Sequence, residues 1–464
     1  GGSWGPHLSK MAASASAWNC PELVVPPGED PAEFLFASGL SDGLPLMPPT
    51  RRRVRRMLQG TTRSPQQVLG SMPPSYEELT VERLAVCAVM AGCRPVHFRL
   101  VVAAAEAALD PAFGLHGVHA TTQGASPVLV VGGPARHECK VNMQMGVAGS
   151  GHRANATILR AVKLALQNVG GASLGGTESS TIGSPCKYGL CLAEWEERCP
   201  EWEPLRIEEK SGLGPDDSSV TLFSAVSGPV QMMDMGLSAD QIIEKLAIML
   251  RTAINPDFLM VNSCLLVVSP EHYDKLLAGG IKSKAELRRR LWEACLVDVG
   301  RRKPVPKWNS PDSLHVIVAG SGAGKFSSFM PGFGTGPELS TGGFASSPVT
   351  KSVDAAVAMP EERQQEVVAK PDDELLLDPR AASRARLSLA IRGGLDAGSV
   401  VGLLDISKYR SSDFLDALER QFKGAFPSVQ LRRYRKATVT RPCQVEVRQQ
   451  IERECSHVVA ALAD

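Results

Sequence analysis

The chain of 464 residues is 43% hydrophobic and 21% charged, and its formal net charge is +1. This composition is typical of a globular protein and excludes wholesale disorder, while the charge excludes a surface that is basic throughout. No stretch approaches the roughly 20 apolar residues that span a membrane, and the arginine run Arg51–Arg56 is interpreted as the solvated face of a helix. Neither nucleic acid nor a membrane is therefore an expected partner, and assembly into a homo-oligomer stays open.

The N-terminal residues and the cysteines indicate the cellular compartment in which the protein is expected. Met11 is followed by Ala-Ala-Ser-Ala-Ser and resembles a natural start, so residues 1–18 are interpreted as a disordered leader or tag. Eleven cysteines, an odd number without any C-x-x-C pair, favour free thiols in a reducing compartment. Because no apolar core of a secretory signal is present, we expect a cytoplasmic protein, with organelle targeting as the alternative.

Residues 19–354 predict one large mixed α/β domain. Residues 29–58 have the pattern of two short helices joined by a turn rich in Gly and Pro. Ser75 and Glu78 form a capping-box pattern, which predicts a helix over residues 76–93. Pro95 ends that helix, and residues 97–109 predict a second helix antiparallel to the first.

Strand and helix patterns follow one another through the rest of this domain. A buried strand is predicted at residues 126–133, and an amphipathic helix closed by Gly170-Gly171 is predicted at residues 156–171. Further strands are expected at residues 220–226, 264–269 and 314–320, and further helices at residues 239–253 and 283–296, the latter capped by Ser283. These elements predict helices that cover a sheet whose strand order does not follow from the sequence.

The composition changes near residue 355. Residues 355–382 are polar and acidic with three prolines, and we interpret them as a linker. Residues 383–464 alternate strand, helix, strand, helix and strand, which predicts a short doubly wound domain with a parallel sheet. The predicted fold class is thus mixed α/β, followed by a short parallel α/β domain.

Three pieces of this C-terminal domain carry a family resemblance: VVGLLDISKYRSSDFLDALERQF, RYRKATVTRP and ECSHVVAALAD. They resemble the UGSC family of selenoproteins and their cysteine homologues, which is named for a (seleno)cysteine-Gly-Ser-Cys motif after a strand of this kind. The resemblance places that motif at or near the position after Asp464, so the domain is expected to be truncated before it. The family's reactive residue is therefore assigned to no position of this chain.

The large domain carries a second resemblance, in the pieces DGLPLMPPT, AVMAGCRP, LHGVHATT, NATILRA, NVGG, PCKY and VIVAGSGAGKFSSF with the later PVTKSV. In this order they resemble the large domain found beside or fused to UGSC modules in bacteria. That resemblance implies kinship and fold. It also singles out Lys187 and Tyr188 as candidate acid/base groups in a pocket.

LHGVHATT places two histidines, His116 and His119, three residues apart. On a helix they would share a face and could chelate a metal or divide acid and base roles. Gly117 and the pair Thr121-Thr122 favour a loop or strand instead, where the histidines would point to opposite faces. Two interpretations remain: structural histidines, or catalytic histidines with Thr121 and Thr122 as ligand contacts.

Two glycine-rich segments are candidate ligand contacts. GVAGSGHRAN precedes a helix, and its candidates to hold a carboxylate or phosphate, against the alternative of a plain capped loop, are Gly149, Ser150, Gly151, His152, Arg153 and Asn155. VIVAGSGAGKFSS lacks the first glycine of a phosphate-binding loop, which excludes an ATPase of that type. Its turn still offers the following candidate contacts, against the alternative of a tight turn with an exposed lysine: Gly320, Gly322, Gly324, Lys325 and Ser327.

Each candidate segment lies at a strand end or a helix start, so we expect both histidines, the glycine-rich loop and the turn to converge on one pocket. The leading hypothesis is an enzyme with an anionic small-molecule ligand and no assigned cofactor, related to thiol- or selenol-dependent redox or nucleophilic enzymes. One alternative is a non-catalytic ligand-binding protein or degenerate paralogue. The other is a metal-assisted lyase or hydrolase that uses His116 and His119.

Overall fold

A computed structural model gives the structure of the chain. It describes residues 18–209, 212–233, 238–298, 300, 303–334, 346–358, 375–380, 394–396, 398–407, 411–437 and 443–461. The interpretation of residues 1–17 as a leader lies outside these residues. Trp18, by contrast, packs against the core of the large domain, where Arg55 lies 5.5 Å from the centre of its ring.

Two four-stranded sheets form the centre of the large domain, where the sequence had indicated one sheet. The first has the order β13 (Val349–Ser352), β6 (Ser219–Ala225), β4 (Ser126–Gly132) and β5 (Leu190–Ala193). The second has the order β11 (Leu314–Val318), β8 (Cys264–Val268), β12 (Phe326–Pro331) and β7 (Val230–Met233). The pairs β4–β5 and β8–β11 are parallel and the other pairs are antiparallel.

Alternate residues of the central strands face opposite ways, and both faces are buried. Val128 and Val130 of β4 belong to an apolar layer that also contains Leu265 and Val267 of β8, so this layer lies between the two sheets. The intervening Leu129 and Val131 of β4 face a separate core formed with helices. An unbroken apolar run is what a strand buried on both faces requires.

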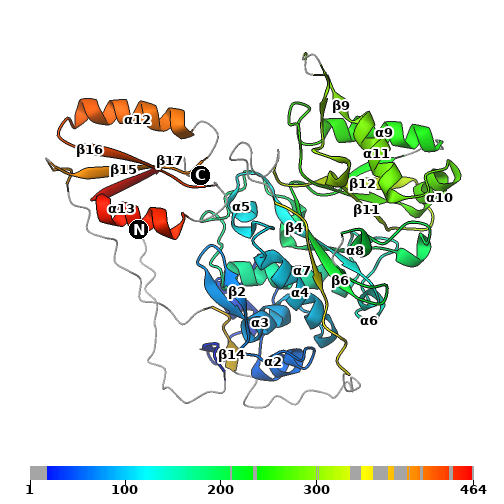
Figure 1. Ribbon diagram of the computed structural model, residues 1–464. Helices are drawn as coiled ribbons and strands as arrows, with labels where there is room; N and C mark the ends of the chain where they lie inside the picture. The colour runs from blue at the N-terminus through cyan, green and yellow to red at the C-terminus, as the bar shows by residue number, and fades with distance from the viewer. Residues whose placement is uncertain are drawn as a thin grey trace.

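Helices cover the outer face of each sheet, giving four layers (Figure 1). The first sheet is covered by α3 (Val81–Ala91), α4 (Phe98–Leu109) and α7 (Arg153–Asn168). The second is covered by α9 (Ala239–Thr252), α10 (Pro270–Ala278) and α11 (Lys284–Ala294). The smaller elements around these layers are β1 (Glu22–Val24), α1 (Pro31–Ala37), α2 (Arg51–Leu58), α6 (Ala135–Glu138), α8 (Leu205–Glu208), β9 (Leu296–Val297) and β10 (Val305–Pro306).

The expected helix over residues 76–93 begins later than the capping pattern indicated. Residues before it form a hairpin of β2 (Val68–Met72) and β3 (Glu77–Thr80), and α3 starts at Val81. Thr80 is the cap, because its Oγ1 accepts a hydrogen bond from the N–H of Arg83 at 3.3 Å. The hydroxyl of Ser75 instead donates to the carbonyl of Val169 at 3.2 Å, so a tertiary contact replaces the expected cap.

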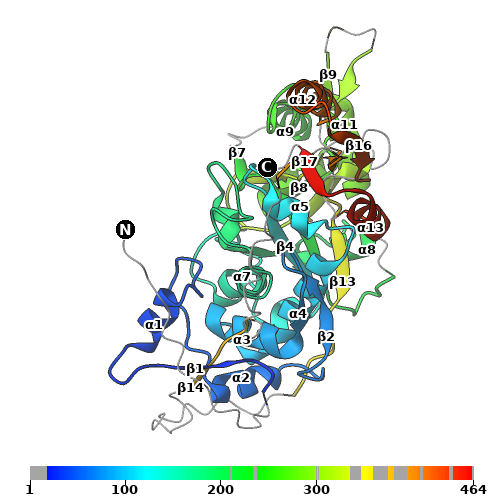
Figure 2. The same cartoon turned by 90° about the vertical axis from the view of Figure 1, so that its left-hand side faces the viewer.

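The C-terminal domain confirms the predicted alternation. It consists of β15 (Val400–Asp405), α12 (Ser411–Ala425), β16 (Gln430–Arg435), α13 (Val445–Glu454) and β17 (His457–Ala461). The sheet has the order β16–β15–β17 and is parallel throughout. Figures 1 and 2 show it as a separate module whose strand β17 ends close to α5 (Leu115–Ala120) of the large domain.

Part of the expected linker belongs to the large domain. Residues Leu375–Leu377 form β14, which pairs antiparallel with β1. Leu376 and Leu377 are fully buried in the core that α3, α4 and α7 share. The three-leucine run is apolar enough to add a strand despite the charged residues before it. Residues 359–374 and 381–393 lie outside the described residues.

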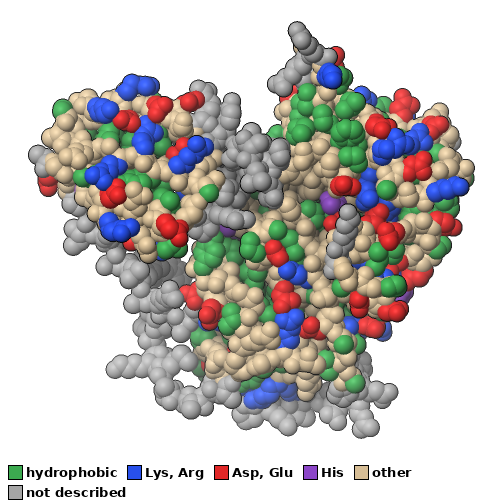
Figure 3. Space-filling model, viewed as in Figure 1, with side chains coloured by type: hydrophobic (Ala, Val, Ile, Leu, Met, Phe, Trp, Pro, Cys, Tyr) green, Lys and Arg blue, Asp and Glu red, His purple; other side chains and the backbone are tan. Residues whose placement is uncertain are grey.

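The surface agrees with the near-zero net charge. Lys and Arg side chains are interspersed with Asp and Glu over both domains on the face that Figure 3 shows. Within the part of the chain that the structure describes, no helix has the length and apolar character needed to cross a bilayer.

A buried ion pair ties the two halves of the large domain together. Lys284 opens α11 and its Nζ lies 2.6 Å from Oε1 of Glu194, which follows β5 of the first sheet. Both side chains are almost inaccessible, at 0% and 1% exposure. The second oxygen of Glu194 accepts the N–H of Leu205 at 2.8 Å. Breaking such a pair leaves a charge buried without compensation.

We expect Lys284→Met to lower the free energy of unfolding by about 3–5 kcal/mol, because it leaves the Glu194 carboxylate buried and unpaired. Urea denaturation followed by circular dichroism measures the loss. The control is Arg289→Met, which removes an exposed pair with Glu293 on the same helix and should cost less than about 1 kcal/mol. Equal losses for the two variants would contradict this role of the buried pair.

Candidate functional site

A cavity of about 540 Å³ lies beside α7 and is lined by ionisable side chains from several elements of the large domain. His119 enters it from α5, Lys163 from α7, and Lys187 and Tyr188 from the short helix η2 (Pro185–Tyr188). The loop between α7 and η2 adds Glu178. Three of the four residues predicted as catalytic, His119, Lys187 and Tyr188, therefore line one cavity.

Glu178 is the acceptor around which the polar groups of this cavity are arranged. Its Oε1 lies 2.7 Å from the ammonium nitrogen of Lys187 and accepts the hydroxyl of Ser180 at 2.5 Å. The same ammonium group donates to the carbonyl of Ala125 at 3.0 Å. Burial alone would raise the pKa of Glu178, but the hydrogen bonds from Lys187 and Ser180 outweigh it and lower the pKa. Glu178 is therefore a carboxylate at neutral pH.

His119 is a neutral imidazole held against that carboxylate. Its Nδ1 lies 3.4 Å from Oε2 of Glu178, and only 7% of the residue is exposed. Burial, assisted by the charge of Lys163, lowers the pKa of His119 to about 3 although Glu178 acts in the opposite direction. Because a carboxylate accepts hydrogen bonds, it favours the tautomer with the proton on Nδ1. Nε2, which is buried and has no hydrogen-bond partner among the described residues, then carries a lone pair.

Lys163 is the basic group that the sequence did not single out. It is half-buried on α7 and makes no hydrogen bond or ion pair within 4 Å to any described residue. Burial, followed by the charge of Lys187, lowers the pKa of Lys163 to about 8, against the opposing effect of Glu178. A neutral amine is therefore available near physiological pH, as a general base or nucleophile requires. In the sequence, Lys163 occupies a polar position of an amphipathic helix, a pattern typical of solvated lysines.

His116 lies on the same helix as His119 but outside this cavity. The expectation of a loop or strand here is wrong, because residues Leu115–Ala120 form the helix α5. The His116 ring stacks on that of Tyr76 with centroids 6.1 Å apart and an interplanar angle of 12°. Burial lowers the pKa of His116, and Lys436 of the C-terminal module lowers it further.

Thr121 and Thr122 hold the local backbone. Thr121 ends α5, and its hydroxyl oxygen accepts the N–H of Gln123 at 3.1 Å. The carbonyl of Thr122 accepts the N–H of Thr181 at 2.8 Å. Thr181 belongs to the loop that carries Glu178, so these threonines fix the cavity wall, where the sequence had indicated ligand contacts.

The glycine-rich loop before α7 lies at a second cavity. Gly149 lines this cavity of about 510 Å³ together with Gly320, while Gly151 and His152 are exposed. Asn155 is buried and its side-chain atoms are used internally: Oδ1 accepts the N–H of Asn142 at 2.8 Å, and Nδ2 donates to the carbonyl of Cys191 at 3.0 Å. Asn155 thus braces the loop, and its predicted role as a ligand contact stays a prediction.

The turn between β11 and β12 is also held from within the protein. Gly320 donates to the carbonyl of Met143 at 2.9 Å, and Gly324, whose φ of +141° suits glycine, donates to Glu271 at 3.1 Å. The ammonium nitrogen of Lys325 lies 3.8 Å from Oε1 of the same Glu271. Gly322, between Gly320 and Gly324 in the chain, is exposed. Ser327 is fully buried with its hydroxyl 2.6 Å from Nδ1 of His272, so its side chain serves the core rather than a ligand.

The predicted residues are therefore divided between two cavities, and the expected convergence on one pocket is not observed. The 540 Å³ cavity contains His119, Lys187 and Tyr188, whereas the 510 Å³ cavity contains Gly149 and Gly320. Among the residues with a described position, no group of three or more His, Cys, Asp or Glu side chains is placed to hold a metal ion. Neither His116, stacked on Tyr76, nor His119, held by Glu178, belongs to such a group.

Fold and cavity together define a two-module α/β protein with a basic, partly desolvated cavity in the larger module. Residues 375–464 match the model of the UGSC family, and the C-terminal region thereby belongs to that family. The match begins at β14, the strand that packs on the large domain, and leaves the rest of that domain unassigned. No curated protein and no solved structure matches the chain.

The lowered pKa of Lys163 predicts a pH-dependent stability. An unfolded chain keeps the Lys163 proton up to about pH 10, whereas the folded protein loses it near pH 8. Between these values the unfolded state binds more protons, so stability rises with pH. We expect the free energy of unfolding of the wild type to rise from pH 8 to pH 10 relative to that of Lys163→Met, as measured by urea denaturation. Lys245→Met, which removes an exposed lysine, should run parallel to the wild type; a parallel profile for Lys163→Met would refute the assignment.

Proposed function

We propose that the large domain is an enzyme that binds a small anionic molecule in the 540 Å³ cavity and transfers a proton there, with Lys163 as the base. The observation that carries the proposal is the placement of Lys163, whose amine has no partner among the described residues, beside the Glu178–Lys187 pair and a neutral His119. Of the two carboxylates in the lining, Asp42 is paired with Arg160 at 2.8 Å, so Lys163 and Lys187 face Glu178 and leave the cavity basic, which favours an anionic ligand. Cavities of this size suit small-molecule substrates.

The residues have separate roles in this proposal. Lys187, oriented by Glu178 and the carbonyl of Ala125, attracts a substrate carboxylate. The neutral amine of Lys163 takes a proton from the carbon next to that carboxylate and returns it to the product. Nε2 of His119 accepts a hydrogen bond from a hydroxyl or amino group of the substrate. A base with a pKa near the working pH is effective in both directions.

Apolar side chains at the mouth of the cavity favour an organic rather than an inorganic ligand. Leu174 is 84% exposed and Ile182 is 96% exposed, and both line the cavity on the loop that carries Glu178. Exposure of large apolar side chains beside a cavity is typical of surfaces that contact a ligand. Tyr188, which is half-exposed and also lines the cavity, adds an aromatic ring and a hydroxyl.

A non-catalytic binding protein is the second candidate function. The same cavity would bind an anion without turnover if Lys163 served only as a positive charge. Redox chemistry of the thiol or selenol type rests on the family resemblance alone. We also propose a reducing, cytoplasmic compartment, which the eleven free cysteines of the described residues support.

Solvent-deuterium exchange distinguishes catalysis from binding. In D2O, we expect the full chain to exchange the C–H next to the carboxylate of at least one member of a panel of 2-hydroxy acids, 2-amino acids and malonates, and ¹H NMR follows this exchange. Lys163→Met should lower the exchange rate by about 10²–10⁴-fold, the usual contribution of a general base, and Lys245→Met should leave it unchanged. Retained ligand binding without exchange in the wild type would favour the non-catalytic alternative.

We further expect no thiol–disulfide exchange from the cysteines of this chain. Nine of the eleven are buried, and burial raises the pKa of these thiols, to about 12 for Cys93. Cys443 and Cys455, which are half-buried, flank the ten-residue helix α13, so roughly 15 Å or more separates them. Insulin reduction should stay at background; turnover that disappears in Cys443→Ser would overturn this prediction.

A further inference from the structure

The cavity of about 510 Å³ lies in the apolar layer between the two sheets. Leu192 of β5 lines it from the first sheet, and Val267 of β8 and Met330 of β12 line it from the second. The loop before α7, residues 146–149, forms another wall. Protein interiors are normally packed without spaces of this size, so the layer between the sheets is incompletely filled here.

The register of the second sheet places one row of side chains along the cavity. Ser328 of β12 lies opposite Gln231 of β7 on one side and opposite Val267 of β8 on the other. Residues paired across strands point to the same face of a sheet, and so do residues two apart along a strand. Ser328 therefore shares its face with Phe326 and Met330, and all five residues line the cavity.

Small residues leave the cavity open. Ser328 stands between two large residues on its face of the strand, and Ala319 and Gly320 follow β11. Ala148 and Gly149 belong to the loop before α7. Cavities of about 300–1,000 Å³ with a mostly apolar lining and a few polar groups are typical small-molecule sites. The composition of this lining therefore suits an organic ligand.

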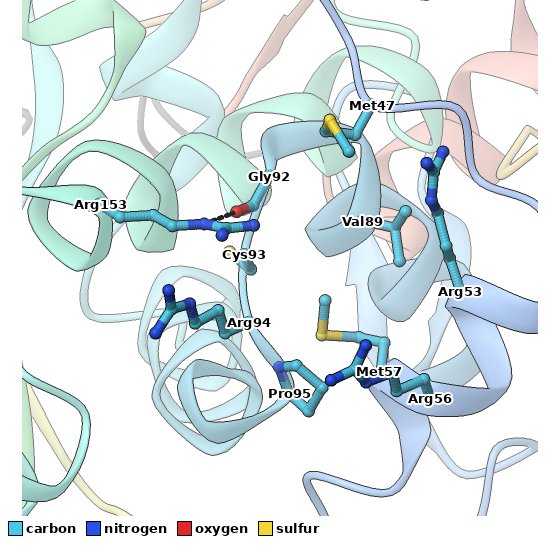
Figure 4. Close-up of a pocket in the computed structure, with 10 residues that line it drawn as sticks. All are labelled: Met47, Arg53, Arg56, Met57, Val89, Gly92, Cys93, Arg94, Pro95 and Arg153. Carbon is cyan, nitrogen blue, oxygen red and sulfur yellow. Dashed lines mark hydrogen bonds between the residues drawn. The ribbon is translucent and has the colours of Figure 1, made fainter. Parts of the chain in front are cut away.

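The lining of this cavity carries no charge, because none of the described residues that form it has an ionisable side chain. A third cavity, shown in Figure 4, is lined instead by four arginines, among them Arg153, whose Nε donates to the carbonyl of Gly92 at 2.7 Å. A charged ligand that enters the 510 Å³ cavity loses its hydration without meeting an opposite charge, which is costly. The lining therefore favours an uncharged ligand.

The hydroxyl of Ser328 supplies a polar contact. Its Oγ is buried and has no hydrogen-bond partner among the described residues. Leaving such a group unsatisfied is unfavourable, and a ligand hydroxyl that bonds to it removes this cost. Rotation about the Cα–Cβ bond moves a serine hydroxyl between staggered positions, so a ligand in the cavity can meet it.

Two further side chains favour an aromatic ligand. Phe326 is 52% exposed although it lines the cavity, so its ring is accessible to a ligand. The thioether of Met330 is buried in the layer between the sheets. Aromatic rings pack favourably against other aromatic rings and against thioether sulfur. The ring of a ligand would thus lie between these two side chains.

We propose that the 510 Å³ cavity binds an uncharged aromatic molecule that carries a hydroxyl group. The aromatic ring contacts Phe326 and Met330, and the hydroxyl forms a hydrogen bond with Oγ of Ser328. This cavity shares no lining residue with the cavity of Lys163, so either function can fail without the other. The sequence predicted an anion at the glycine-rich loop, and an anion is the alternative outcome of the test.

Equilibrium dialysis of the full chain against three related probes tests the proposal. 2-Naphthol is uncharged at neutral pH and carries one hydroxyl, naphthalene lacks the hydroxyl, and 2-naphthoate carries a negative charge on the same ring system. We expect 2-naphthol to bind about tenfold or more tightly than 2-naphthoate, because burial of an unpaired carboxylate is costly. The comparison uses only the binding that Ala148→Trp removes, which leaves out any 2-naphthoate held beside Lys163.

Two tryptophan variants locate the binding. Ala148→Trp adds a large side chain to the part of the loop that lines the cavity, and should weaken 2-naphthol binding by about tenfold or more because it competes for the same space. Ser150→Trp adds the same bulk two residues further on, outside the lining, and should leave the affinity within about twofold. Both positions are exposed, so the fold is retained, as circular dichroism will verify.

Ser328→Ala tests the hydrogen bond. It should weaken 2-naphthol by about threefold to tenfold, the usual net effect of one hydrogen bond, and leave naphthalene unchanged. Because the hydroxyl has no partner among the described residues, the urea midpoint of this variant should not fall below that of the wild type.

The proposal is overturned if the wild type binds no 2-naphthol, or if Ser150→Trp weakens binding as much as Ala148→Trp. It is also overturned if Ser328→Ala changes the affinities for naphthalene and 2-naphthol by the same factor. Tighter binding of 2-naphthoate that Ala148→Trp removes would assign the cavity to an anion instead.

Discussion

Strands that are buried on both faces hold the large domain together. In β4 every residue is buried, and successive side chains contribute alternately to the layer between the sheets and to the layer under α3, α4 and α7. Each fully buried Val or Leu contributes about 1.5–3 kcal/mol through removal of its surface from water. Such layers tolerate few polar groups, because a buried polar group is costly unless it is hydrogen-bonded. The polar residues that could bind a ligand or transfer a proton therefore lie where strands and helices end.

Helix α7 connects these apolar layers to the cavity of His119, Lys163 and Lys187. Arg153 begins the helix and Lys163 lies ten residues further on, a separation of about 15 Å at the rise of an α-helix. The two positions differ in their surroundings. Lys163 has Glu178 within electrostatic reach, whereas Nε of Arg153 donates to the carbonyl of Gly92. A nearby carboxylate suits Lys163 as a group that gains and loses a proton.

The strands and helices could be predicted from the sequence more completely than the residues of the candidate site. Unbroken apolar runs such as residues 126–133 and 264–269 predicted β4 and β8, because burial on both faces requires them. The division into two sheets did not follow, since periodicity does not show which neighbour each face meets. His119, Lys187 and Tyr188 were found through local motifs and family resemblance, whereas Lys163 and Glu178 were missed. Their roles arise from desolvation and from neighbours far along the chain, which no local pattern records.

The C-terminal module acts on the large domain through charge at α5. Lys436, just after β16, lowers the pKa of His116, and the views in Figures 1 and 2 agree that α5 lies near the end of β17. His119, one turn along the same helix, is governed by groups of the large domain itself: its own burial, Lys163 and Glu178. A helix presents residues three apart on neighbouring parts of one face. Within α5, the pKa of His116 is therefore the one lowered by Lys436 of the C-terminal module, and His119 is the residue that lines the cavity.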